Sequence, residues 1–145
     1  MKPYMSKGLL VFVFTFAVLF SAAYPDVLAK NKFLVEFIDY DFLSFLGIVL
    51  SISIASLLQL SISVSQAEQF NKDAKTEIIA ELRSTTVWMV GIFAAGFVLV
   101  LIRPMITGNL NWLSFLNGFA IFLIVFYLVI LLDTIIAAFE LHSTQ

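Results

Sequence analysis

Residues 112–132 form an uninterrupted apolar run, WLSFLNGFAIFLIVFYLVILL, that contains no charged side chain. A helix of about 20 such residues crosses the hydrocarbon core of a bilayer, where every backbone amide must be hydrogen bonded within its own segment. Three further uncharged runs occupy residues 8–24, 42–64 and 85–102. The sequence therefore predicts four membrane-spanning helices.

The overall composition is that of a membrane protein. Of the 145 residues, 61% are hydrophobic and only 12% are charged, and the mean hydropathy is +1.04. A soluble domain carries about 25% charged residues, so this chain has too few polar side chains to coat a soluble fold, and the surplus apolar surface must face lipid. The net charge of −2 argues against direct nucleic-acid binding. The absence of cysteine excludes disulfides and thiolate metal sites.

The predicted fold class is all-α: a polytopic membrane protein in which residues 1–145 form a single transmembrane domain, a four-helix bundle with short loops. The helices are expected at about 8–24, 42–65, 85–103 and 112–138. Short connections predict that consecutive helices are antiparallel neighbours. We expect the first and last helices, which are rich in Phe and Leu, to be peripheral and to face lipid.

The basic residues outside the apolar runs predict the orientation, because cytoplasmic segments are enriched in them. One side of the predicted membrane has five and the other has three: Lys2, Lys7, Lys72, Lys75 and Arg83, against Lys30, Lys32 and Arg103. A multi-pass membrane protein with both termini in the cytoplasm is therefore expected.

The first apolar run has two interpretations. Basic residues before a short apolar core, followed by small-residue sites at 21–23 and 27–29, also describe a cleaved signal peptide. The apolar stretch is long for such a peptide. A retained helix is therefore favoured, and cleavage of residues 1–29 is the alternative.

Small and polar residues form a stripe along the second run. At 100° per residue its members lie within one arc of the helix: Ser44, Ser51, Ala55, Ser56, Gln59, Ser63 and Gln66. Such a face lets another helix approach closely and hydrogen bond across the contact, or it lines a water-filled pore, since polar groups avoid lipid. Helix packing is favoured over a pore. A serine that bonds the carbonyl four residues before it would weaken both interpretations.

The third run contains a pair of small residues, Gly91 and Ala95, at the four-residue spacing typical of close helix contacts. The pair predicts close packing against another helix, either in the same chain or in a second copy.

A helical hairpin is predicted at residues 66–84 on the cytoplasmic side, because neither glycine nor proline occurs between Gly47 and Gly91. Its second half places two kinds of side chain at helical spacing: the acids Asp73, Glu77 and Glu81, and the apolar Ile78, Ile79 and Leu82. A solvated surface is favoured. The alternative is a docking surface for a soluble cytoplasmic partner.

The loop between the first two runs contains KFLVEFIDYDF, residues 32–42, whose apolar side chains share one helical face. This pattern is typical of a short helix that lies in the membrane interface. Its acids Glu36, Asp39 and Asp41 are expected to be solvated, and the alternative is a loosely held cation or an external ligand.

Four polar residues within or beside the apolar runs, Gln59 of the stripe among them, have predicted positions or partners. Asn117 and Gln59 are predicted to hydrogen bond between helices. Arg103 and Asp133 are predicted to lie at opposite membrane interfaces.

The side chains required for catalysis are scarce. The single histidine, His142, is close to the C-terminus, there is no cysteine, and no glycine-rich phosphate loop or metal-ligand spacing occurs. An enzyme, a metal site and a cofactor are therefore not expected. Two classes remain: a homo-oligomeric membrane subunit that acts as sensor or anchor for a cytoplasmic partner, and an oligomeric pore or membrane-permeabilising effector.

In overall layout the chain resembles the small four-span membrane proteins of bacterial antiviral defence systems, in particular the Kiwa-like membrane subunits. The resemblance covers the whole chain as architecture and includes one charged hairpin, AEQFNKDAKTEIIAELR at residues 67–83. It contains no diagnostic motif, so it assigns no functional residue. It implies a homo-oligomer that senses phage at the envelope and holds a cytoplasmic effector.

Overall fold

The computed structural model describes residues 4–67, 70–106 and 108–143, and this part of the chain consists of helices and short connections, without a strand. The elements in chain order are α1 (Tyr4–Ala23), α2 (Pro25–Ala29), α3 (Lys32–Phe37), α4 (Tyr40–Gln66), α5 (Lys72–Ile102), the 3-10 helix η1 (Arg103–Ile106) and α6 (Leu110–Ser143). The predicted all-α class is confirmed.

Three helices, α4, α5 and α6, are long and apolar enough to cross a membrane. In α1 the described apolar stretch, Val11–Ala23, is shorter. At 1.5 Å per residue, α4 is about 40 Å long, α5 about 46 Å and α6 about 51 Å, whereas α1 is about 30 Å.

Helix α5 begins well before the apolar run that predicted it. The side-chain oxygen of Asn71 accepts a hydrogen bond from the backbone N–H of Ala74 at 2.7 Å, which caps the first turn. Since no glycine or proline interrupts the following residues, the charged segment from Lys72 and the apolar segment form one continuous helix. The described part of the predicted hairpin therefore consists of the end of α4 and the first turns of α5. Its residues 68 and 69 lie outside the described residues.

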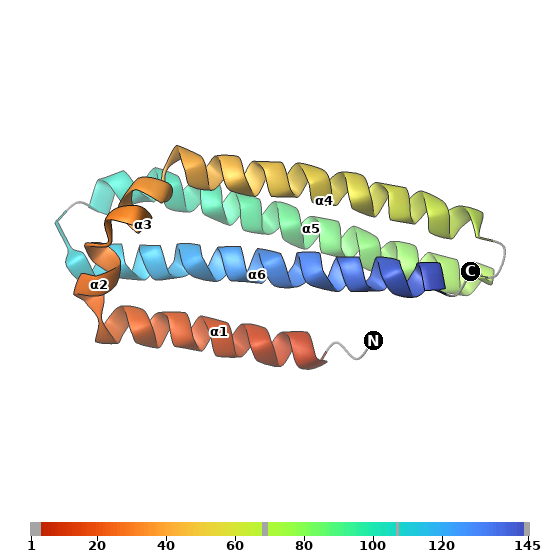
Figure 1. Cartoon of the computed structure of the whole chain (residues 1–145), viewed down its shortest axis with the longest axis horizontal. Coiled ribbons are helices and arrows are strands. Elements are labelled where there is room, and N and C mark those ends of the chain that lie inside the picture. Colours follow the sequence, from red (N-terminus) through yellow and green to blue (C-terminus); the bar gives the residue numbers. More distant parts are fainter. Residues whose placement is uncertain (1–3, 68–69, 107, 144–145) are drawn as a thin grey trace.

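Helix α6 is the central helix of the fold and contacts α1, α2, α4 and α5. Helix α1 packs against α6, and α4 packs against α5, as Figure 1 shows. Two expectations were therefore wrong: the first two long helices, α1 and α4, do not pack together as neighbours, and the last is not peripheral. A helix that is apolar on all sides is suited to a central position.

The reason lies in the connection between α1 and α4. This segment is not a simple loop but folds into α2 and α3, which cross one end of the molecule (Figure 1). It thereby carries the chain from one side of α6 to α4 on the other. We call residues 25–38 the strap, and the end of the molecule that they cover the strap end. The opposite end, where α4 turns into α5, is the turn end.

The core lies mainly between α4, α5 and α6. Its most deeply buried apolar side chains include Phe42, Leu46, Leu57, Met89, Ile92, Leu99, Leu123 and Tyr127. Gly96 marks the close approach of α4 to α5, because a β-carbon placed there would lie 2.6 Å from Leu46 Cδ1 and 3.1 Å from the Phe42 ring.

At the turn end, α4, α5 and α6 extend beyond the shorter α1 (Figure 1). This extension includes the first turns of α5, with Asp73, Glu77 and Glu81, and the last turns of α6. At the strap end the exposed aromatic residues Tyr24, Tyr40 and Trp112 are of the type found at membrane interfaces.

Candidate functional site

The predicted stripe of α4 lies on the outside of the molecule. Ser51, Ala55, Ser56, Gln59 and Ser63 are all exposed. The buried residues of α4, among them Phe42, Leu46 and Leu57, occupy the opposite side of the helix. Consequently no described helix of the chain covers the stripe. Gln59, for which an interhelical hydrogen bond was predicted, lies on this outer face.

Three of the four serine hydroxyls of the stripe are bonded to the backbone of their own helix. Ser51 Oγ donates to the carbonyl of Gly47 at 2.8 Å, Ser56 Oγ to that of Ile52 at 2.9 Å, and Ser63 Oγ to that of Gln59 at 3.1 Å. Bonding within the helix leaves these hydroxyls little to offer either a second helix or water, so it weakens both the packing and the pore interpretation. The exposed side chains Ile48, Ile52 and Ile62 share this face, so it carries large as well as small residues.

The two small residues singled out on α5 occupy different environments. Gly91 is exposed, and a β-carbon placed there would meet nothing within 4 Å. Ala95 is half-buried against the core. The close contact with α4 is made instead by Gly96, one position farther along the chain. The pair Gly91–Ala95 thus lies between the outer face and the core.

The predicted docking residues lie at the start of α5. Asp73, Glu77 and Glu81 are exposed, whereas Ile78 and Leu82 are half-buried, with Leu82 packed against the core. The accessible part of this surface is therefore mainly its acidic stripe. Within the described residues the only ion pair is formed elsewhere, between Lys30 and Asp26 at 2.7 Å.

A lysine links the start of α5 to the end of α4. Lys75 Nζ donates a hydrogen bond to the carbonyl of Ser65 at 3.0 Å. This carbonyl belongs to the last turn of α4, where carbonyls lack partners within the helix and where a positive charge is favourable. Lys75 therefore stabilises the end of α4 and holds the acidic start of α5 beside it.

Hydrogen bonds from side chains to parts of the described chain more than 60 residues away occur at the strap end. Ser114 Oγ donates to the carbonyl of Ser21 at 3.0 Å. In a continuing helix that carbonyl would accept from the N–H of residue 25, but residue 25 is proline and has no N–H. Ser114 of α6 replaces the missing donor.

Two further side chains hold the strap in the same manner. Asn117 Nδ2, also on α6, donates to the carbonyl of Leu28 at the end of α2, at 2.7 Å. The predicted interhelical hydrogen bond of Asn117 is confirmed. Arg103 Nη1 donates to the carbonyls of Val35 at 3.0 Å and Ile38 at 2.6 Å, at the end of α3. Arg103 lies at the end of α5, as expected, but it binds the strap.

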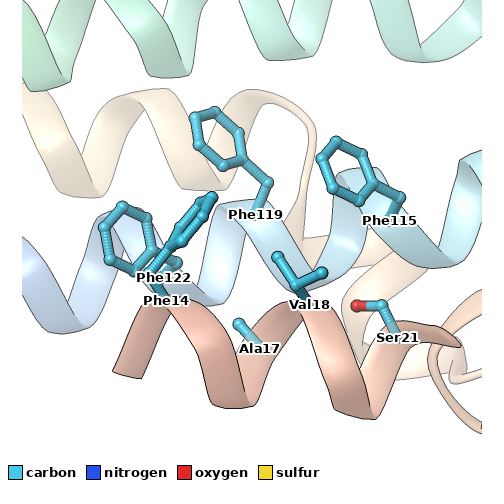
Figure 2. A pocket seen from close by; sticks show the side chains of 7 residues that line it. All are labelled: Phe14, Ala17, Val18, Ser21, Phe115, Phe119 and Phe122. Carbon is cyan, nitrogen blue, oxygen red and sulfur yellow. The ribbon is translucent and has the colours of Figure 1, made fainter. Parts of the chain in front are cut away.

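A shallow groove runs between α1 and α6, close to the Ser114–Ser21 contact. Figure 2 shows the side chains that line it: Phe14, Ala17, Val18, Ser21, Phe115, Phe119 and Phe122. Its lining is almost entirely apolar, and the Ser21 hydroxyl is buried without a hydrogen-bond partner among the described residues. Among the residues that the structure describes, no three His, Cys, Asp or Glu side chains lie close enough together to bind a metal ion.

Two residues of the sequence indicate part of the strap geometry. Pro25 leaves the Ser21 carbonyl without its helical donor, and Asn31 has the position of a helix cap, which it occupies by accepting from the N–H of Leu34 at 3.2 Å. The partners Ser114 and Arg103 could not be identified, because they depend on which helices the strap crosses. No protein-family model, curated protein or solved structure matches the chain.

Proposed function

We propose that the chain is a non-enzymatic subunit of the bacterial inner membrane that self-associates through the outer face of α4 and holds a soluble cytoplasmic partner at its turn end. In this proposal α1 is a fourth membrane span and both termini are cytoplasmic. The observation that supports self-association is that no described helix covers the face of α4 on which Ser51, Ala55 and Ser56 are exposed.

The same observation favours a packing surface over a pore. Small residues allow two helix backbones to approach closely, whereas hydroxyls that are bonded to their own helix offer few hydrogen bonds to water in a pore. Gly91 adds a second uncovered small position on the neighbouring helix α5. A second copy of the chain is the partner that a membrane subunit always has available.

The proposed partner site is the acidic start of α5. Asp73, Glu77 and Glu81 project into solvent beyond the proposed membrane boundary, and their charges are not neutralised by an ion pair among the described residues. A basic surface of a cytoplasmic protein would complement them. By its resemblance to Kiwa-like subunits, we propose that the complex responds to phage at the envelope.

Self-association is tested with the double variant Ser51→Leu, Ser56→Leu. Two large side chains on the stripe should hold a second helix away, and we expect the self-association constant to fall at least tenfold, about 1.4 kcal/mol. The measurement is the particle mass in nanodiscs or detergent by light scattering. Thermal stability of the single chain should not change, because both serines are exposed.

The matched control is Ile52→Leu, Ile62→Leu, on exposed positions of the same helix that are already large. It should retain the wild-type mass. A double serine variant with the wild-type mass would contradict self-association through the stripe. Liposomes containing the wild-type chain should remain impermeable to ions. An ion flux that the serine variant abolishes would instead support the oligomeric pore.

Partner docking is tested with the charge reversals Glu77→Lys and Glu81→Lys. We expect the recovery of a soluble protein that co-purifies with the tagged wild-type chain to fall by about tenfold or more, because like charges would then face each other. The control Glu36→Lys reverses an exposed acid in the strap and should leave recovery unchanged. Equal recovery with all variants would remove this site from the proposal.

A further inference from the structure

The strap is held to the rest of the molecule at three successive helix ends. The carbonyls of Ser21, Leu28 and the pair Val35 and Ile38 belong to the last turns of α1, α2 and α3. The last carbonyls of a helix have no donor within it, and in or near lipid they need one. Each receives it from a side chain on α6 or at the end of α5.

The remaining contacts of the strap are apolar. The strap buries four of its own apolar side chains, Leu28, Ala29, Leu34 and Ile38. The ring of Phe37 packs edge-on against that of Phe42 in α4, with the ring centroids 6.1 Å apart. In water such burial would dominate the energetics. At a membrane it does not, because lipid tails are as apolar as these side chains and can replace them at little cost.

It follows that the polar contacts define the closed position of the strap. The two contacts from α6 hold the part near α1, where Ser114 and Asn117 lie one helical turn apart. The far part, α3, depends on a single guanidinium group that binds two carbonyls. Helix α3 is also amphipathic, with Leu34 buried and Lys32 and Glu36 exposed, as is typical of a helix able to lie on a bilayer.

We infer that the strap is a conformational latch, which means that it has a closed and an open position, and that the Arg103 guanidinium group holds it in the closed position. In the closed state Arg103 binds the end of α3. In the open state α3 leaves η1 and lies in the membrane interface, where lipid covers Leu34 and Ile38, while Ser114 and Asn117 still hold the end of α1 and α2. This latch goes beyond the proposed function and does not depend on self-association or on a cytoplasmic partner.

The chain contains no cysteine, so pairs of spin labels can be introduced without altering the background. Phe33→Cys on the strap and Met105→Cys on η1 replace exposed side chains, which are 67% and 82% accessible. Their distance distribution is measured by pulsed electron spin resonance in nanodiscs of phosphatidylethanolamine and phosphatidylglycerol. With Arg103 in place we expect one narrow distribution.

With Arg103→Met we expect a second population, displaced by up to about 9 Å, the length of the six-residue α3. Arg103→Lys, which keeps a cationic donor, should restore most of the narrow distribution. Labels at Ile48→Cys and Val98→Cys report on α4 and α5 away from the strap and should not change. An unaltered strap distance in Arg103→Met, or an equal change in the control pair, would overturn the latch.

Discussion

The substitution Asn117→Asp is expected to destabilise the protein by about 3 kcal/mol, although it changes the shape of the side chain very little. Asn117 is fully buried, and its Nδ2 donates to the carbonyl of Leu28 at 2.7 Å. An ionised carboxyl group cannot donate this bond and would direct an oxygen toward the carbonyl oxygen. It would also place a charge in a site that excludes water.

The measurement is thermal unfolding in detergent, followed by circular dichroism, with Asn111→Asp as the matched control. Asn111 is exposed at the start of the same helix, so its substitution should change stability by less than about 0.5 kcal/mol. Equal losses at the two positions would show that burial and the hydrogen bond of Asn117 are unimportant.

The loss in Asn117→Asp should depend on pH. Burial disfavours the charged form of the introduced carboxyl group. The loss of stability is therefore complete while that group is ionised and declines when acid protonates it. The protonated group can again donate to Leu28. A loss that does not diminish on acidification would contradict this cause.

The second large effect is expected from Gly96→Leu, at about 2–3 kcal/mol. A β-carbon at this position would already lie 2.6 Å from Leu46 Cδ1, and a full leucine side chain must separate α4 from α5. Melting temperature in detergent is the measurement.

Gly91→Leu is the matched control, because it introduces the same side chain on the same helix where nothing lies within 4 Å. It should leave the melting temperature of the single chain close to that of the wild type. If both variants melted at the same lowered temperature, helix propensity or insertion would be the cause, and the close packing at Gly96 would not.

The apolar runs were sufficient to predict the long helices, because length and hydrophobicity are local properties of the sequence. They could not predict the order of the helices in space. The run at 8–24 is equally compatible with packing against α4 or α6, and the choice is made by the strap, which carries the chain across the molecule. Loop length alone was therefore a poor guide to which helices are neighbours.

The candidate sites show the same limit. Periodicity correctly grouped Ser51, Ala55 and Gln59 on one face of a helix, but it contains no information on whether another helix of the chain covers that face. Likewise, Gly91 and Gly96 differ by five positions on one helix, and only the packing of α4 distinguishes the exposed glycine from the one in close contact.

Helix α5 connects the acidic surface at the turn end with Arg103 at the strap end. Its first residues bear the acidic surface, its far end is followed directly by Arg103, and between them the helix runs for 31 residues without a proline. Such a rod acts as a lever about 46 Å long. A tilt of about 5° around its midpoint would displace each end by ~2 Å in opposite directions, so a displacement at Arg103 would be transmitted to Asp73 along the whole length of the helix.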